Sequence, residues 1–267
     1  MVARLLYQMA WIDAKRAFQQ TRLALVPIGS VEQHGPHMPL GTDFMIAEYL
    51  AKAAGERLDA IITPVIPIGY AAYHADFPGT LSVSKQTLTA YVGEFCAYLV
   101  KYGITHIIFV NGHGGNGGPL DTVGQTLRDQ GIAVANFMWW ESAPGLDSDW
   151  SPNGHGDAIE GSMILAIEPE TFRKDRAALP VNKKLTTSLQ ALDGSNVSFG
   201  RGQVRVALRV GDVSDTGNML EYGLNDTANF TRSPADANER LGREMLDGLA
   251  EYLVAFGREF LDLSFRP

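Results

Sequence analysis

The sequence predicts an α/β protein of three layers, in which helices cover both faces of a mostly parallel central sheet. Over the first two thirds of the chain, short apolar runs rich in β-branched residues alternate with longer amphipathic stretches. Strands that alternate with helices in this way are typical of βαβ units. The length of 267 residues suits one large domain with a substantial core. We therefore expect a single domain over residues 1–267.

Four apolar runs predict the strands of this sheet. Each is short and almost continuously apolar, as expected for strands buried on both faces. The later part of the chain, rich in Ser, Thr, Asn and Gly, offers one further strand candidate, Val204–Val210. The four runs are Leu23–Ile28, Ile61–Ile68, Ile104–Val110 and Ile132–Met138.

Helical patterns lie between these runs and at the end of the chain. Ser84 is suited to cap one of the helices, and Gly103 is placed to end it. The last helix carries apolar residues at helical spacing on one face. The expected helices are Asp43–Leu58, Lys85–Tyr102, Leu120–Gln130 and Pro234–Phe256.

Composition excludes several classes of protein. The formal charge of −8 argues against a sequence-independent nucleic-acid binder, which needs a basic face. No stretch approaches the roughly 20 apolar residues that cross a bilayer, so no membrane partner is expected. The single cysteine, Cys96, excludes an internal disulfide and fits a reducing compartment. We expect a cytoplasmic protein with a small-molecule substrate.

Imidazoles and carboxylates follow two of the predicted strands. Glu32 and His34 come after Leu23–Ile28, Asp43 opens the next helix, and His113 follows Ile104–Val110. The carboxyl ends of parallel strands lie at one edge of a sheet, where ligands bind. Four of the six histidines occupy these segments and the segment around His155. This clustering predicts a site at that edge.

The residue types in this cluster suit a pair of metal ions. In extended chain, Glu32 and His34 point the same way, and a carboxylate beside an imidazole suits zinc, manganese or iron. Asp43 can bridge two ions, and His113 lies on a glycine-bounded turn that a ligand can approach closely. Two ions about 3.5–4 Å apart with shared ligands form a hydrolytic site.

Simpler interpretations exist for each residue taken alone. Glu32 and His34 could form a surface pair, and Asp43 could only cap its helix. The turn at 111–116 could bind phosphate through backbone N–H groups, and His37 could orient a neighbour. A phosphate-binding module leaves the nearby acids unexplained, since such sites prefer Lys and Arg. A serine hydrolase is not indicated, because this sequence contains no Gly-x-Ser-x-Gly turn.

The sequence resembles the creatininase family of metal-dependent amidohydrolases. The resemblance rests on four motifs that occur in the family's order over most of the chain to about residue 170. The first is long and highly specific, and the third is strong. The motifs are residues 26–43 (VPIGSVEQHGPHMPLGTD), residues 77–80 (FPGT), residues 111–116 (NGHGGN) and His155 through Ser162.

This resemblance implies a single α/β/α domain, two divalent metal ions per subunit and a cytosolic homo-oligomer, often a hexamer. Zinc is the expected metal, with manganese or iron as alternatives. By the same resemblance Glu32 and His34 bind different ions, Asp43 bridges them, and His113 joins Glu32 on the first. His155 corresponds to a catalytic histidine that carries a proton, and Glu160 to an acidic residue of the site.

One position departs from the family pattern. Members that hydrolyse creatinine carry a glutamate ligand two residues after the histidine of the third motif, where this chain has Gly115. Glu160 is the expected replacement, so it is both a candidate metal ligand and a candidate catalytic residue. The expected reaction is hydrolysis of a cyclic amide or other C–N bond. The alternatives are C–C ring opening of a diketo-inositol, as in a 3-dehydro-scyllo-inosose hydrolase, or removal of a formyl group from a formamide.

The expected mechanism uses a hydroxide between the two ions. Two cations lower the pKa of water from 15.7 towards about 7, and His155 then protonates the leaving group. Substrate contacts are expected from Tyr73, His74 and Phe77 on the loop at 73–80, and from Gly114. Trp139, Trp140 and Trp150 are candidates to stack on a flat substrate, or to pack in the core.

Overall fold

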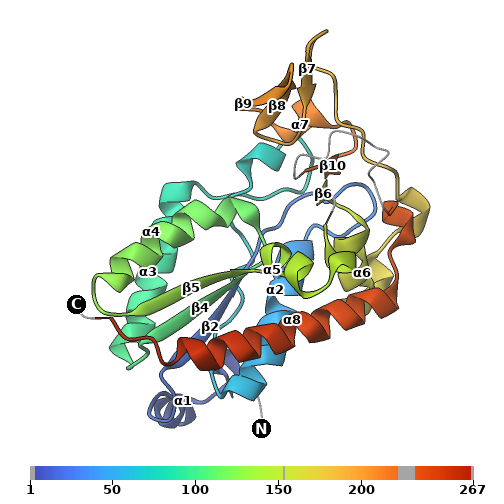
Figure 1. Ribbon diagram of the computed structural model, residues 1–267. Helices are drawn as coiled ribbons and strands as arrows, with labels where there is room; N and C mark the ends of the chain where they lie inside the picture. The colour runs from blue at the N-terminus through green and yellow to red at the C-terminus, as the bar shows by residue number, and fades with distance from the viewer. Residues whose placement is uncertain (1–3, 153, 222–231, 266–267) are drawn as a thin grey trace.

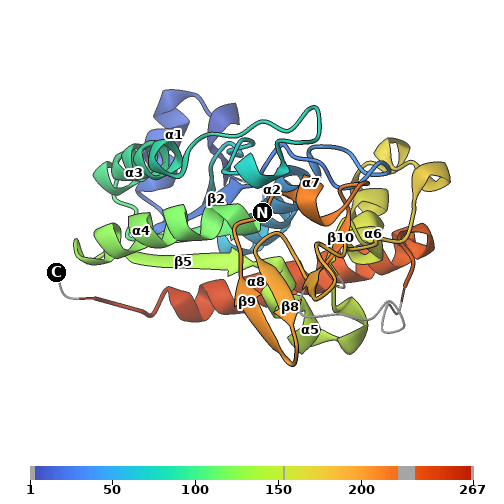
Figure 2. The same cartoon turned by 90° about the horizontal axis from the view of Figure 1, so that it is seen from above.

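The computed structural model describes residues 4–152, 154–221 and 232–265. Its centre is a parallel sheet with the strand order β1-β3-β2-β4-β5, and helices cover both faces of that sheet (Figure 1, Figure 2). This arrangement confirms the expected three-layer α/β/α class. The strands are β1 (Arg4–Leu5), β2 (Leu23–Ile28), β3 (Ile61–Ile62), β4 (His106–Asn111) and β5 (Ala133–Met138).

Alternate residues of the central strands supply the two halves of the core. Leu23 and Leu25 of β2 pack into one cluster with α2, α6 and α8, whereas Ala24 and Val26 pack into the other with α3 and α4. The period of two places successive side chains on opposite faces of the sheet. The helices are α1 (Trp11–Phe18), α2 (Thr42–Leu58), α3 (Lys85–Lys101), α4 (Gly117–Arg128), α5 (Trp139–Leu146), α6 (Ala158–Ile167), α7 (Val210–Val213) and α8 (Glu239–Phe260).

The expected boundaries of α3 are confirmed. The Ser84 side chain accepts a hydrogen bond of 3.1 Å from the backbone N–H of Thr87 and so caps the helix. Gly103 has φ of +97°, a left-handed conformation that glycine adopts without steric cost. The helix ends at Lys101, directly before this turn.

The largest differences between the expected elements and the structure lie at three places, and the bounds of α4 and β4 shift by one to three residues. The run at 61–68 forms only β3 and one isolated bridge at Ile66, because Pro64 and Pro67 interrupt it and proline has no N–H to donate. The run at 204–210 is not one strand: β9 ends at Arg205 and Val210 begins α7. The last helix begins at Glu239, later than predicted, because the Asn238 side chain caps it at the N–H of Leu241.

Two small antiparallel sheets complete the described fold. One pairs β6 (Gly154–His155) with β10 (Met219–Leu220), and the other joins β7 (Leu189–Ala191), β8 (Asn196–Phe199) and β9 (Gly202–Arg205). The β7–β8–β9 sheet stands apart from the central sheet at one end of the molecule (Figure 1). Of the described helices, none combines the length and apolar character needed to span a bilayer.

Candidate metal centre

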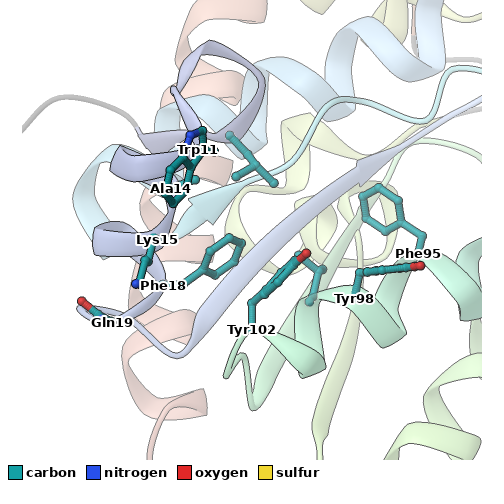
Figure 3. Close-up of a pocket in the computed structure, with 10 residues that line it drawn as sticks. Trp11, Ala14, Lys15, Phe18, Gln19, Phe95, Tyr98 and Tyr102 are labelled. Atoms are coloured by element: carbon teal, nitrogen blue, oxygen red, sulfur yellow. The ribbon is translucent and has the colours of Figure 1, made fainter.

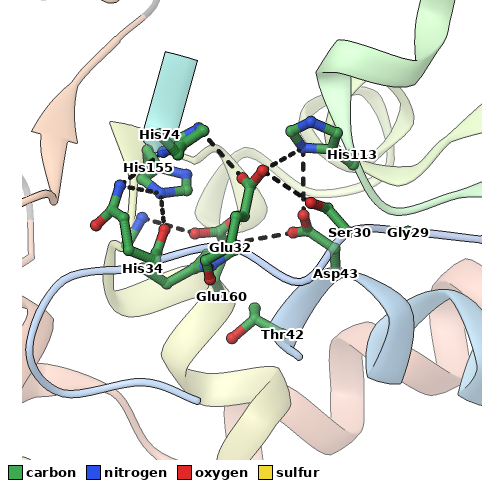
Figure 4. Close-up of polar contacts among 12 residues, drawn as sticks. Gly29, Ser30, Glu32, His34, Thr42, Asp43, His74, His113, His155 and Glu160 are labelled. Carbon is green, nitrogen blue, oxygen red and sulfur yellow. Dashed lines mark hydrogen bonds and ion pairs between the residues drawn. The ribbon is translucent and has the colours of Figure 1, made fainter. Parts of the chain in front are cut away.

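Five imidazoles and carboxylates gather beyond the carboxyl end of the central sheet (Figure 4). They come from the segment after β2, the first turn of α2, the turn after β4 and the first turn of α6. All are buried except Glu160, which is half-buried. The structure thus brings together the residues that the sequence singled out as ligands, at the edge where parallel sheets bind ligands. They are Glu32, His34, Asp43, His113 and Glu160.

Glu32, Asp43 and His113 form the first of two groups. Nδ1 of His113 lies 3.2 Å from Oε2 of Glu32 and 3.2 Å from Oδ2 of Asp43. Nε2 of the same ring lies 2.8 Å from the carbonyl oxygen of Tyr70. A carbonyl oxygen only accepts, so Nε2 carries the ring proton. Nδ1 of the neutral ring is then an acceptor that faces two carboxylate oxygens.

His34, Asp43 and Glu160 form the second group. Nε2 of His34 lies 2.9 Å from Oδ1 of Asp43 and 3.9 Å from Oε1 of Glu160. Nδ1 of His34 lies 3.2 Å from the backbone carbonyl oxygen of Glu32, to which it donates. Nε2 is again left as an acceptor. Asp43 therefore presents one carboxylate oxygen to each group.

These groups of acceptors fit two cations. Nε2 of His34 and Oδ2 of Asp43 are buried without a hydrogen bond to any described residue. Facing acceptors repel each other unless a proton or a cation lies between them. Ligand atoms about 2.0–2.2 Å from one zinc ion lie roughly 3.3–3.6 Å apart in a tetrahedral site. The contacts of 2.9–3.9 Å in the two groups are close to that spacing.

The pKa values of the same residues show their electrostatic coupling. Burial would lower the pKa of His34, but Asp43 and Glu160 outweigh burial and raise it to about 10. Burial also opposes a charge on His113, yet Glu32 and Asp43 hold its pKa well above the ordinary value. Burial would raise the pKa of Asp43, but His34 and His113 lower it below its usual range. Without metal, the neighbouring carboxylates therefore keep both rings protonated near neutral pH.

The family follows from comparison with known proteins. The sequence profile of the Creatininase family, described as creatinine amidohydrolase, matches residues 7–256. The chain belongs to the creatininase family. The mycofactocin precursor peptide peptidase of Mycolicibacterium smegmatis is 35% identical over 159 residues, which cover 57% of this chain and 61% of that relative. The creatinine amidohydrolase of Pseudomonas putida is 29% identical over 173 residues, 57% of this chain and 66% of that relative.

The fold of solved creatininases is similar over nearly the whole chain. The structure named "Creatininase Mn" superposes with a TM-score of 0.74 at 22% identity and covers 97% of this chain and 99% of that one. The curated relatives match a shorter part. The chain spans less than two thirds of the length of the first of them, at 61%.

By the resemblance described above, Gly115 stands where creatinine-hydrolysing members of the creatininase family carry a glutamate ligand. A Cβ atom there would lie 2.2 Å from the carbonyl oxygen of Tyr70 and 2.5 Å from Nε2 of His113. The backbone therefore passes too close to these atoms to carry a side chain without movement. Glu160 is the carboxylate that reaches the second group instead.

The start of α6 positions Glu160. Oδ1 of Asp157 accepts hydrogen bonds from the backbone N–H groups of Ile159 and Glu160, at 2.9 and 3.0 Å, and so caps the helix. Oε2 of Glu160 accepts from the N–H of Gly156 at 2.7 Å. Oε1 is then the oxygen turned towards His34. Burial raises the pKa of Glu160 to about 8.

Sequence reasoning missed Ser30, Gln33 and the contact between His74 and Glu32. Ser30 Oγ donates to Oε2 of Glu32 at 3.0 Å. Nε2 of Gln33 donates to Nδ1 of His74 at 2.7 Å, so Nε2 of His74 carries the ring proton and faces Oε1 of Glu32 at 3.3 Å. His74, an expected substrate contact, lines the cavity at this site, and its ring also contacts Gln33 through Nδ1 and Glu32 through Nε2. Ser30 and Gln33 flank Glu32 in the first motif, the only signal that marked them.

His155 lies beside the second group. Its Nε2 atom is 2.6 Å from the carbonyl oxygen of Gln33 and therefore carries the ring proton. Its ring centroid lies 4.2 Å from that of His34. Burial, followed by the nearby His34, holds the pKa of His155 well below its ordinary value. The ring is neutral at pH 7, and Nδ1 is its basic atom.

A small cavity of about 100 Å³ opens onto these side chains. Tyr73 and Gly114 line it, as do Trp139 and Trp140. Phe77 does not line this cavity, because it packs into a separate apolar cluster beside Val210 and Val213. Trp150 packs into the core on the α8 side, which is the second of the two roles considered for the tryptophans. Glu221 also lines the cavity, although no motif marked it.

Two histidines lie away from the centre. His37 packs edge-on against Phe172 with ring centroids 5.6 Å apart, so of the two histidines in the first motif only His34 belongs to the site. His106 lies in β4, and its Nε2 atom is 2.9 Å from the backbone oxygen of Leu263.

Proposed function

We propose that this chain is a single-domain hydrolase that uses two divalent metal ions to cleave a C–N bond in a small polar substrate. The observation that carries the proposal is the shared carboxylate of Asp43, which presents one oxygen to each of two ligand groups. Glu32 and His113 complete the first group, and His34 and Glu160 complete the second. A carboxylate between two sites is the feature expected of a dinuclear hydrolytic centre.

The side chains of the protein would orient the metal ligands and transfer a proton during the reaction. When bound, two cations would polarise a carbonyl group and make water more acidic. The carbonyl oxygen of Tyr70 fixes the tautomer of His113, and that of Glu32 fixes the tautomer of His34. His155 begins neutral, so its Nδ1 atom would take a proton from the attacking water and then give that proton to the leaving nitrogen.

We propose zinc as the metal, with manganese and iron as alternatives. Two imidazoles and three carboxylates make a ligand set of borderline softness, which suits all three ions. The similar structure named "Creatininase Mn" supports manganese as the first alternative. Metal analysis of protein purified without added metal separates these choices.

Hydrolysis of a C–N bond agrees with the names of the relatives, a peptidase and an amidohydrolase. Tyr73 and Gly114 are the proposed substrate contacts because both line the cavity. His74 lines the same cavity and also contacts Glu32, whereas Phe77 packs in the separate apolar cluster outside the cavity. Opening of a diketo-inositol ring and deformylation remain the alternatives, since both need the same centre.

The decisive experiment compares Asp43→Ala with Asp129→Ala, which removes an exposed carboxylate at the end of α4. Elemental analysis should find two metal ions per chain in the wild type and in Asp129→Ala, and none in Asp43→Ala. A screen of lactams, formamides, peptides and cyclic ketones, with and without chelator, then identifies the bond that is broken. Two ions retained in Asp43→Ala would refute the dinuclear centre.

We also propose that the chain forms a homo-oligomer, a hexamer by the family resemblance. An apolar groove of about 780 Å³ lies between α1 and α3 and is lined by aromatic side chains (Figure 3). Trp11 is 76% exposed and Tyr98 is 59% exposed, an unusual concentration of apolar surface for a monomer. Sedimentation velocity should show an oligomer that Trp11→Ser weakens. The net charge and the single cysteine support a cytoplasmic protein without nucleic-acid partners.

A further inference from the structure

A second, larger cavity lies next to the metal centre. It has a volume of about 560 Å³ and lies between the β7–β8–β9 sheet and the first residues of α3 and α4. Tyr73, Gly114 and Glu221 line both this cavity and the one at the metal centre. The two spaces therefore adjoin, and one molecule could extend from the first into the second.

The sizes of the two cavities indicate where most of a substrate must lie. Small-molecule sites usually enclose about 300–1,000 Å³. The cavity at the metal centre, at about 100 Å³, has room for the reacting group and little more. The neighbouring cavity falls within the usual range for a ligand. A substrate larger than its scissile bond would need to occupy it.

Two cationic side chains line this larger cavity. Nζ of Lys85, at the start of α3, lies 4.8 Å from the ring centroid of Tyr70, and Arg205 projects from β9 on the opposite wall. Within the described part of the chain, neither side chain forms an ion pair. Their charges are available to an anionic ligand, for which Arg in particular offers a fork of donors.

Two acidic residues, Asp193 and Glu221, also line the cavity, and they offset only part of this positive charge. The carboxylate of Asp193 accepts hydrogen bonds from Ser195 and Asn196 within its own turn, at 2.7 to 3.1 Å. Burial raises the pKa of Glu221 to about 8, so that its carboxyl group is uncharged at pH 7. It can then donate a hydrogen bond to a ligand oxygen.

We propose that the cavity between α3, α4 and the β7–β8–β9 sheet binds an anionic terminal group of the substrate, with Lys85 and Arg205 as its partners. This inference rests on the proposed function, because it places the reacting bond of the same substrate at the metal centre. The anionic group bound there is a carboxylate or a phosphate. The natural substrate is then expected to be an elongated acid, larger than a simple cyclic amide.

The test uses metal-free protein, so that no anion can bind through a metal ion. Isothermal titration calorimetry with N-acetylglycine, and separately with inorganic phosphate, should show saturable binding to the wild type. The double variant Lys85→Gln/Arg205→Gln should weaken the binding of the preferred anion at least about tenfold, the effect of losing hydrogen bonds to charged groups. Arg201→Gln, in the exposed turn before β9, is the matched control and should bind as the wild type does.

The outcomes distinguish a carboxylate from a phosphate as the bound group, and they distinguish failure of this anion site from failure of the metal centre. Tighter binding of N-acetylglycine would assign the site to a carboxylate, and tighter binding of phosphate to a phosphate ester. No binding of either anion, or equal binding by the wild type and the double variant, would overturn the inference. Because the titration needs no metal, its failure would leave the metal stoichiometry of Asp43→Ala as an independent test of the centre.

Discussion

Nδ1 of His113 lies 3.2 Å from Oδ2 of Asp43, and the other ring nitrogen is held by the carbonyl oxygen of Tyr70. In its neutral form the ring therefore offers one lone pair, and that lone pair points at a carboxylate. The same relation recurs between His34 and Oδ1 of Asp43. This repetition supports the proposed pair of cation sites.

The two sites should be separable by mutation. His113→Ala removes a ligand from the first group only, and His34→Ala removes one from the second. Each variant should retain one tightly bound ion per chain, measured by elemental analysis after dialysis, and the double variant should retain none. Two ions in either single variant would show that the removed imidazole is not a ligand.

Metal binding should release protons and strengthen as the pH rises. The pKa of His34 is raised to about 10 without metal, above its ordinary value, so at pH 7 the ring is protonated. A ligand must give up that proton, so lowering the pH by one unit should weaken binding about tenfold for each proton released. Calorimetric titration with zinc in two buffers of different ionisation enthalpy measures the number released. A value of zero at pH 7 would contradict the assigned protonation of His34 and His113.

Much of the central fold was predictable because it depends on local patterns. The run Leu23–Ile28 is apolar throughout since both faces of β2 are buried, and the structure has the same boundaries. Ser84 and Gly103 marked α3 through chemistry that acts within one turn. The β7–β8–β9 sheet left no such pattern, because its short strands are held largely by backbone pairing and most of their side chains are not buried.

The ligand residues were predictable for a related reason, and their supporting contacts were not. Glu32, His34 and Asp43 lie within one continuous motif, and His113 follows the neighbouring strand of the same sheet. His74 comes from a loop whose path depends on tertiary packing, and its contact with Gln33 spans 41 positions. No spacing in the sequence distinguishes His74, which joins the centre, from His37, which does not.

Gly115 should tolerate substitution far less well than its neighbour Gly114. A Cβ atom at Gly115 would lie 2.2 Å from the carbonyl oxygen of Tyr70, whereas one at Gly114 would meet no atom within 4 Å. Gly115→Ala should therefore lower the free energy of unfolding by about 1–3 kcal/mol, as overpacking does. Gly114→Ala should change it by no more than about 0.5 kcal/mol. Urea unfolding of the metal-free proteins provides the comparison.

Gly115→Ala should also weaken the first metal site, because the displaced carbonyl oxygen of Tyr70 orients His113. The second site contains neither residue and should keep its ion. Equal stability of the two alanine variants would mean that the backbone near Tyr70 relaxes at little cost. Steric crowding at position 115 would then not explain why this chain lacks the glutamate of the family pattern.

His155 should affect turnover without affecting metal content. Its Nε2 atom donates to the carbonyl oxygen of Gln33, which leaves Nδ1 to accept and return a proton during the reaction. His155→Ala should lower kcat by about 10²–10⁴-fold on whichever compound the substrate screen identifies, the usual contribution of a general acid–base group. Elemental analysis should still find two ions, since His113, His34 and the three carboxylates remain. Loss of one ion would instead indicate that His155 is a metal ligand together with Glu32 and His34, since these three residues also form a possible metal-binding group. Another residue would then have to transfer the proton.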